Sequence, residues 1–460
     1  MNGRFFGEGG SEGWRRLEAD IGWGGKAFDV YASGFDRQSD GELENADFES
    51  RQILVTAGWS WGKRGSRLGI VVQNLEADTG IPFATPDSLT PNRRQDSEQT
   101  LVAVPFNLYF SDSWNIELTG ATIDGTFSFS DPDDPFFSYS GTETTSTQIR
   151  LASNHRFSRH IFSWGGEWRK DEVDSASNLG VNLEGETNEI TSAFLQDVWQ
   201  LAPNVRLLVG ARWDDHDDWG SEVSPRVDLG WRLSDTFELR GGYGKAFRPP
   251  SIGELYFPFS GNPDLEPETS SSTDLGLVYT TRSKKSQWQV TTFSTDLDNL
   301  IEFDFATYSN ANIGKATIRG AELSWEHSIG KRAASFIQGT YLETEDNEGQ
   351  PLLRRPEWSG SWTIHGAFSK HFTGDLTVVY VGSREDVDPV TFERAEADGY
   401  TTGSVALAYS LWNGVEITAR VLNVADTDYQ EALGYPAPGR RYLFGLRLGV
   451  DKAERWQGTP

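Results

Sequence analysis

The stretch Val415-Glu-Ile-Thr-Ala-Arg-Val421 alternates strictly between apolar and polar side chains. Its odd-numbered residues would form one apolar face, while Glu416, Thr418 and Arg420 would form a polar one. Side chains of a β-strand point alternately to opposite sides, so this period of two predicts a strand with water on one side only. We find no stretch of about 12 residues with the spacing of an amphipathic helix. The chain is therefore predicted to be all-β.

The same alternation recurs along the chain, for example at 204–213, 226–233 and 441–450. Short tight turns alternate along the chain with longer polar stretches, and these connections together separate about 22 strands. The longer stretches are predicted at 8–13, 38–47, 79–97, 130–141, 171–187, 213–223, 247–267, 302–311, 345–351, 384–396 and 424–439. Long strands with tight turns at one end and long loops at the other are typical of membrane barrels. We predict a transmembrane β-barrel of about 22 antiparallel strands.

The composition excludes several kinds of site, partner and fold. The 460 residues include no Cys, 17 Trp and a net charge of -27. The lack of Cys excludes disulfides, thiolate zinc sites and cysteine nucleophiles, and the acidic charge argues against a nucleic-acid partner. No apolar run approaches the roughly 20 residues of a membrane-spanning helix, and the first ten residues do not form a signal peptide. A soluble propeller is disfavoured because the chain shows no internal repeat, and sandwich strands average only about 5–6 residues.

Five motifs, in a fixed order, resemble those of the TonB-dependent outer-membrane receptors. The most specific is Tyr243-Gly-Lys-Ala-Phe-Arg-Pro-Pro-Ser-Ile-Gly-Glu-Leu-Tyr256, followed by Gly261-Asn-Pro-Asp-Leu-Glu-Pro-Glu268. The other four lie at 210–226, 299–322, 352–357 and 421–442, so the resemblance covers essentially the whole chain. The order and compactness look most like the cobalamin (vitamin B12) receptors. Haem receptors carry a His between the two boxes of the first motif, and 251–261 contains none.

The resemblance implies a receptor of the Gram-negative outer membrane that takes up a scarce small molecule, either cobalamin or a siderophore-like ligand. It implies contacts with outer-membrane lipid and lipopolysaccharide, a monomeric state, and an inner-membrane TonB-type energy transducer that acts through a plug domain. Two alternatives remain open, namely a passive outer-membrane pore and a soluble carbohydrate-binding β protein. We expect residues 1–450 to form the barrel and 451–460 a polar tail. The plug is then expected to be absent from this chain and supplied in cis or in trans.

The sequence suggests binding sites and no catalytic one. There is no Gly-x-Ser-x-Gly elbow, and the six His are scattered, so we predict that the chain is not an enzyme. Six outer-loop residues are candidates for ligand contacts: Phe257, Phe259, Asn262, Asp264, Tyr308 and Tyr435. Two acidic clusters could supply oxygen ligands to calcium if their loops converge, although they could also be a solvated rim: Asp131, Asp133, Asp134, Asp214, Asp215, Asp217 and Asp218.

Charged residues also fall on the polar faces of the predicted strands. Arg248 is followed by two prolines, which cannot donate to a strand ladder and should send the chain away from the barrel wall. The remaining inward arginines are expected to pair with acidic residues inside the lumen, or to grip a plug. The expected inward set is Arg206, Arg212, Arg226, Arg232, Arg240, Arg420, Arg441 and Arg447, with Asp228, Glu238 and Glu416.

Overall fold

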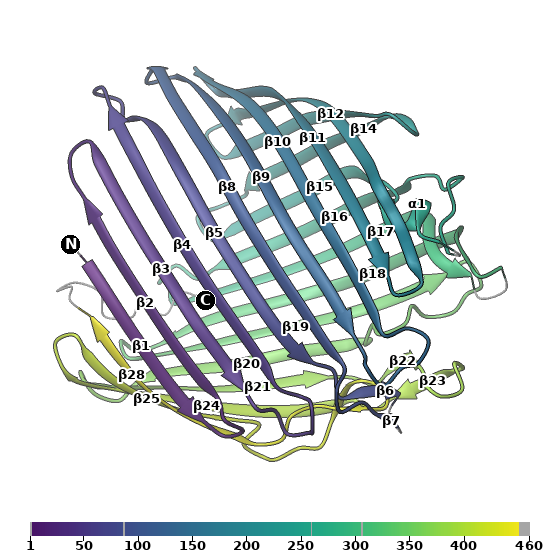
Figure 1. Cartoon of the computed structure of the whole chain (residues 1–460). Helices are drawn as coiled ribbons and strands as arrows, with labels where there is room; N and C mark the ends of the chain where they lie inside the picture. The colour runs from purple at the N-terminus through teal and green to yellow at the C-terminus, as the bar shows by residue number, and fades with distance from the viewer. Residues whose placement is uncertain (1, 86–87, 259, 305–306, 450–460) are drawn as a thin grey trace.

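The computed structural model describes residues 2–85, 88–258, 260–304 and 307–449. Its main element is a closed antiparallel barrel of 22 strands (Figure 1). Each wall strand pairs with its neighbour in sequence, and β1 pairs with β28, placing Arg4 opposite Gly449. No helix in this part of the chain is long and apolar enough to cross a membrane.

The first half of the wall contains eleven strands. They are β1 (Asn2–Gly10), β2 (Arg15–Gly24), β3 (Phe28–Ser39), β4 (Phe48–Trp61), β5 (Ser66–Gly80), β8 (Arg94–Ser111), β9 (Trp114–Ser130), β10 (Tyr139–Phe157), β11 (His160–Ser177), β12 (Gly180–Ala202) and β13 (Val205–His216). The second half completes the circle with β14 (Gly220–Arg232), β15 (Phe237–Arg248), β16 (Glu268–Thr280), β17 (Ser286–Asp304), β18 (Ser309–Ile329), β19 (Ala333–Asp346), β20 (Trp358–Ala367), β21 (Phe372–Val381), β24 (Tyr400–Trp412), β25 (Val415–Leu422) and β28 (Arg441–Gly449). The predicted fold class and strand number are confirmed. The predicted tail at 451–460 lies outside the described residues.

The two faces of the wall differ as the alternation predicts. Outward-facing apolar side chains such as Ile53 and Ile417 are exposed because their neighbours would be lipid. Inward-facing charges form ion pairs, which confirms the predicted lattice at several positions. The pairs include Arg226–Asp228 (2.6 Å), Arg240–Glu238 (2.7 Å), Arg447–Glu416 (2.6 Å) and Arg420–Glu8 (2.5 Å). Most of these side chains are exposed to the lumen, so water screens the pairs and each adds little to stability. Glu8 is the exception, because its carboxylate is only 1% exposed and needs the Arg420 cation.

Tryptophan side chains line the end of the barrel that carries the short turns. Three of their indole N–H groups donate to serine hydroxyls on the adjacent strand: Trp114 to Ser153 (3.1 Å), Trp325 to Ser286 (2.8 Å) and Trp362 to Ser335 (3.0 Å). Amphipathic Trp side chains favour the boundary between lipid and water. Each of these indoles is held against the wall by a partner within the protein.

The wall is taller on one side than on the other (Figure 1). Strands β8 to β12 contain 17 to 23 residues, whereas β25 and β28 contain only 8 and 9. Two predicted long loops are therefore wrong: 171–187 is mostly strand with a two-residue turn between β11 and β12, and β13 and β14 leave only 217–219 between them. These segments are polar on both faces because they rise beyond the lipid-facing band, and the alternation that marks a membrane strand is lost there.

The long loops at the opposite end carry the remaining elements. These are one short helix, α1 (Ile252–Tyr256), and three small hairpins, formed by β6 (Phe83–Thr85) with β7 (Ser88–Leu89), β22 (Arg384–Val387) with β23 (Arg394–Ala397), and β26 (Gln430–Ala432) with β27 (Tyr435–Pro436). We refer to this end of the barrel as the outer end.

Candidate functional site

The connection between β15 and β16 folds into a compact unit at the outer end. Strand β15 stops at Arg248 because Pro249 and Pro250 cannot continue the ladder. Ser251 then caps α1: its hydroxyl accepts from the Glu254 N–H, and the Glu254 carboxylate accepts from the Ser251 N–H. This reciprocal capping box satisfies two N–H groups that a helix start otherwise leaves free. We call residues 249–258 and 260–267 the outer cap.

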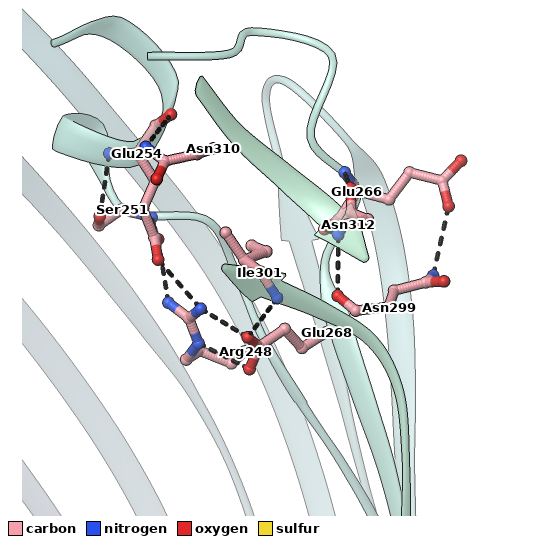
Figure 2. Close-up of polar contacts among 9 residues, drawn as sticks. All are labelled: Arg248, Ser251, Glu254, Glu266, Glu268, Asn299, Ile301, Asn310 and Asn312. Atoms are coloured by element: carbon pink, nitrogen blue, oxygen red, sulfur yellow. Dashed lines mark hydrogen bonds and ion pairs between the residues drawn. The ribbon is translucent and has the colours of Figure 1, made fainter. Parts of the chain in front are cut away.

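An arginine clamp joins the cap to the wall (Figure 2). The Arg248 guanidinium donates to both oxygens of Glu254 (3.0 and 3.1 Å) and to both oxygens of Glu268 (2.8 and 2.7 Å). Glu268 also accepts from the Ile301 N–H at 2.9 Å, which ties β16 to β17. Burial raises the pKa of the Glu254 carboxyl, but the Arg248 guanidinium and the Ser251 N–H outweigh burial and leave it below its ordinary value. The predicted architectural role of Arg248 is consistent with this geometry.

Three asparagines attach the cap to the neighbouring strands (Figure 2). The Asn312 side chain accepts from the Glu266 N–H (2.8 Å) and donates to the Glu266 carbonyl (2.9 Å). It therefore forms with the Glu266 backbone the two hydrogen bonds that a residue of a neighbouring strand would form. The Asn310 side chain donates to the Glu254 carbonyl at 3.3 Å, and that of Asn299 donates to the Glu266 carboxylate at the same distance. The backbone N–H and C=O groups of this loop therefore form their hydrogen bonds within the protein and do not need water.

Beneath these polar contacts the cap has an apolar core. Leu255, Leu265 and Ile301 are 3%, 4% and 9% exposed and pack together, with Tyr256 against them. Most other large apolar side chains of the barrel face outward and are exposed. The cap therefore resembles a small globular fold set on the rim of a membrane barrel.

The structure assembles four of the six predicted ligand residues. Phe257 ends α1 and is 36% exposed, and Tyr308 follows β17 and is 70% exposed. The Asn310 N–H donates to the Ser260 carbonyl at 2.8 Å, which places these two loops side by side. Asp264 is exposed on the same cap, whereas Asn262 holds it together by donating to the Asn310 carbonyl at 2.9 Å. Tyr435 lies on another loop, where its ring packs against Phe83, and Phe259 lies outside the described residues.

The acidic clusters are divided among different environments. Asp131 is 2% exposed and pairs with Arg93, while Asp133 accepts from Asn92 and Asp134 accepts from two backbone N–H groups of its own loop. Asp214 and Asp215 lie in β13 rather than in a loop, which corrects their predicted position, and Asp214 binds Arg212 and Ser192.

The turn after β13 contains Asp217 and Asp218. Next to it, both ring nitrogens of His216, the last residue of β13, already have partners within the protein. Its Nδ1 accepts from the Asp218 N–H at 3.0 Å, and its Nε2 meets Asn188. Within the described residues, no group of three or more His, Asp or Glu side chains is arranged to hold a metal ion. Calcium binding stays a prediction, and Asp131 and Asp214 already have cationic partners.

A second assembly at the outer end escaped prediction. The loops 382–399 and 423–440 enclose a pocket of about 350 Å³. Its acidic and aromatic lining residues are Glu396, Asp398, Tyr400, Asp428 and Tyr429. Each of these residues, taken alone, suggests a solvated loop or a strand end. Only the pairing of two loops that are separate in the sequence brings them together, so no local sequence signal marks the site.

Comparisons with known proteins agree with this architecture. A family model described as TonB dependent receptor-like, beta-barrel matches residues 28–424. This chain belongs to the TonB-dependent receptor family. Members of that family are receptors and transporters, which confirms the predicted family and the prediction that the chain is not an enzyme.

Relatives of this TonB-dependent receptor include cobalamin transporters. The vitamin B12 transporter BtuB of Vibrio cholerae serotype O1 is 27% identical over 289 residues, which are 62% of this chain and 46% of that protein. BtuB of Photobacterium profundum is 24% identical over 455 residues, 94% of this chain and 72% of that protein. The chain thus spans less than half the length of the Vibrio relatives that it matches.

Solved structures of the family share the fold at lower identity. The copper transporter OprC superposes with a TM-score of 0.83 at 16% identity, covering 98% of this chain and 80% of that one. The siderophore receptor PirA from Acinetobacter baumannii gives a TM-score of 0.83 at 14% identity over the same shares. At such identities the likeness establishes the barrel fold and leaves the ligand open.

Proposed function

We propose that this chain forms the barrel of an outer-membrane receptor that takes up a scarce ligand of cobalamin or siderophore type. The observation that carries the proposal is the match to vitamin B12 transporters along 94% of the chain, together with siderophore receptors among the structural neighbours. The rigid outer cap supports it, because a binding platform gains affinity when its backbone is ordered before the ligand arrives. In this proposal Phe257 and Tyr308 contact the ligand.

The proposal includes the partners that such uptake needs. The receptor would reside in the outer membrane of a Gram-negative cell as a monomer, in contact with lipid and lipopolysaccharide. A plug domain, in cis or in trans, would close the lumen and connect it to a TonB-type transducer of the inner membrane. The ion-paired inner face of the wall offers a polar surface that would suit such a plug.

Uptake measurements test this function. The chain is expressed together with a plug domain, in cis or in trans, in cells that lack their own cobalamin and ferric-siderophore receptors, and entry of radiolabelled cyanocobalamin and ferric siderophores is followed. We expect concentrative uptake of one of them that stops when a protonophore is added or when the transducer is deleted. Uptake that is insensitive to both treatments would contradict energy coupling.

A passive pore is the second candidate. Among the described residues, every strand lies either in the wall or in an outer loop, and none of these elements forms a separate domain in the lumen. A barrel of 22 strands is wide enough to conduct when its lumen is unfilled. Conductance across a planar bilayer distinguishes the two: a large, permanently open pore favours the second candidate, and closure on adding a plug domain favours the first. The third alternative, a soluble carbohydrate-binding protein, is excluded by the family assignment.

A further inference from the structure

The short turns of the barrel are basic, although the chain as a whole is acidic. Within the described part of the chain, the ten short turns contain ten Lys or Arg residues and only two acidic ones, against a net charge of -27 for the whole sequence. Six of the ten fall in three consecutive turns that contain no acidic residue: Arg282, Lys284 and Lys285 in 281–285, Lys331 and Arg332 in 330–332, and Lys370 in 368–371. We call these three turns the basic arc. The turns 203–204 and 233–236, farther along the same rim, contain no Lys or Arg.

The three turns of the basic arc lie side by side. They join strands β16 to β21, each of which pairs with the next. The Ser328 N–H, at the end of β18, donates to the Lys285 carbonyl at 2.7 Å, and the Ala367 N–H, at the end of β20, donates to the Arg332 carbonyl at 2.6 Å. Each turn is thus hydrogen-bonded to the hairpin that carries the next turn. Because neighbouring strands lie about 4.8 Å apart, successive turns are spaced by about 10 Å.

The backbone of the arc is ordered, but its cations have no protein partner. In the first turn the Lys284 N–H donates to the Thr281 carbonyl at 2.8 Å. All six basic side chains are exposed, and none of them forms a hydrogen bond or ion pair with another described residue. Arg64, in the turn between β4 and β5, differs in this respect because it pairs with Asp112 at 2.7 Å. The positive charge of the arc is therefore not neutralised within the described protein, and it favours an anionic partner.

Tryptophan side chains place the arc at the depth of lipid headgroups. The Trp325 indole donates to Ser286, the residue directly after Lys285, and the Trp362 indole donates to Ser335, three residues after Arg332. With a rise of about 3.3 Å per residue, the basic residues lie within about 10 Å of these indoles along the strands. Indoles favour the boundary of the hydrocarbon core, and the headgroup region extends about 5–8 Å beyond it. Long Lys and Arg side chains can reach phosphates at that depth.

This position favours a lipid over a soluble acidic protein. Trp288 and Trp362 are 40% and 41% exposed on the lipid-facing side of the wall, and the rings of Trp288 and Trp325 stack with their centres 5.0 Å apart. A phospholipid can contact both features at once, with its acyl chains on the indoles and its phosphate among the cations. A soluble protein would meet the cations alone.

The charge of the arc also selects among phospholipids. A zwitterionic headgroup has an ammonium group beside its phosphate, and six clustered cations repel that ammonium. An anionic headgroup has a phosphate without such a cation, so its interaction with the arc is attractive throughout.

We propose that the basic arc binds anionic phospholipid headgroups in the membrane leaflet on the short-turn side. The inference rests on the membrane location in the proposed function, and it goes beyond that function by assigning one lipid class to one sector of the rim. The sector of 203–204 and 233–236 has no cations in its turns and should show no such preference.

Lipid enrichment around the full chain in bilayers tests the proposal. Since the chain has no Cys, a single fluorophore can be attached at Ser283→Cys in the basic arc or at Pro203→Cys in the uncharged control turn. The bilayer is phosphatidylethanolamine with a minor fraction of phosphatidylglycerol, and a nitroxide quencher is carried by one lipid or the other. We expect phosphatidylglycerol to be enriched about fivefold at position 283 and not at position 203, the effect of about one basic side chain close to an anionic headgroup.

Charge variants then test whether the arc causes the enrichment. Replacing Lys284, Lys285 and Lys331 together by Gln in the Ser283→Cys protein should reduce the enrichment to about the level at position 203, because three of the six cations are lost. Replacing the same three residues by Arg keeps the charge and should keep the enrichment. Each variant is first checked for a heat-modifiable band on a gel, which reports an intact barrel.

Equal quenching at positions 283 and 203, or enrichment that survives the three Gln substitutions, would overturn the proposal. Binding of polyglutamate to the detergent-solubilised protein without lipid enrichment would also overturn it, since an acidic polymer would then be the partner. Missing enrichment with energy-dependent uptake intact would refute the lipid site and leave the receptor function standing. Enrichment that depends on the three lysines supports the lipid site even where no uptake is measured.

Discussion

The outer cap and the paired-loop pocket lie at the same end of the barrel but treat their polar groups in opposite ways. In the cap, Arg248, Glu254 and Glu268 are fully engaged with one another and with the backbone, above a core that includes Leu255. At the pocket, Asp386 is buried and engaged below, whereas the carboxylates of Glu396 and Asp398 are exposed and form no hydrogen bond or ion pair with another described residue. The difference shows two uses of polar side chains: those of the cap pair with one another and hold a loop in place, while those at the pocket rim face water.

The largest expected effect comes from the apolar core of the cap. Leu255→Ala removes a side chain that is 3% exposed, and such truncations cost about 2–5 kcal/mol through lost burial and a cavity. Because the wall strands pair with one another and not with the cap, we expect faster hydrogen exchange in the outer cap and an unchanged barrel melting temperature. Phe257→Ala, at the exposed position that follows the same helix, is the matched control. Global destabilisation by Leu255→Ala would show that the cap and the wall fold as one unit.

The arginine clamp should give the next largest effect. Arg248→Ala leaves Glu254 and Glu268 without their cation, and we expect the cap to lose about 1–3 kcal/mol of local stability. The value is moderate because the Arg248 side chain is 45% exposed and solvent screens the pair. Arg248→Lys keeps the charge but not the planar bidentate contacts, so it should restore only part of the loss. Equal protection in all three proteins, measured by hydrogen exchange, would show that the asparagine contacts alone hold the cap.

Acidification should loosen the pocket through Asp386. Burial raises the pKa of this carboxyl, but the Leu433 and Val387 N–H groups and the Arg354 guanidinium together hold it below its ordinary value of 3.8. A depressed pKa means that the charged form stabilises the fold above pH 4, roughly, and that this contribution is lost as the pH falls further. The effect is expected to be about 1 kcal/mol or less, because Arg354 is more than half exposed.

Spin labels report this loosening without interference, since the chain has no Cys. Labels introduced by Val390→Cys and Ala425→Cys should show a broader distance distribution at pH 3 than at pH 7. Adding Asp386→Asn should produce the broader distribution at both pH values. If the distribution in the labelled parent stays the same at pH 3, Asp386 does not govern how the two loops pair.

The smallest expected effect is that of calcium. Asp131 and Asp214 are neutralised by Arg93 and Arg212, so a bound ion would have to compete with existing partners. We expect the melting temperature in excess calcium and in EDTA to agree within about 2 °C. A larger calcium-dependent increase that disappears in Asp217→Asn would instead support the site suggested by the sequence.

Much of the barrel was predictable from the sequence, and the errors in the predicted strands have one physical cause. Inside the membrane one face of each strand meets lipid, so strands such as β25 (Val415–Leu422) show clear alternation. Above the membrane both faces meet water, and the outer ends of β11 and β12 were mistaken for a loop because Glu172 and Asp174 face outward as polar residues do in loops. The strand number survived the error because the turn between β11 and β12 was still counted as one connection.

The two candidate sites also differ in how far their structure could be predicted from the local sequence. The start of the cap was predictable because two prolines directly after Arg248 end the strand, but the capping by Ser251 was not predicted. The pocket was not, since it depends on how two loops pair after the barrel has closed. Asn262 also shows the limit of residue-type reasoning, because its bond to the Asn310 carbonyl could not be predicted from the sequence, while its role as a ligand contact stays a prediction.

The pairing of β1 with β28 has a consequence for engineering. Because Arg4 lies opposite Gly449, the beginning and the end of the barrel are neighbours at the rim that carries the short turns. A short linker could join them, and the chain could be reopened at another short turn, such as the one between Trp61 and Ser66, without changing any wall contact. The barrel would then be a ring whose starting point is arbitrary, and permuted genes could place a fused protein beneath any chosen pair of strands.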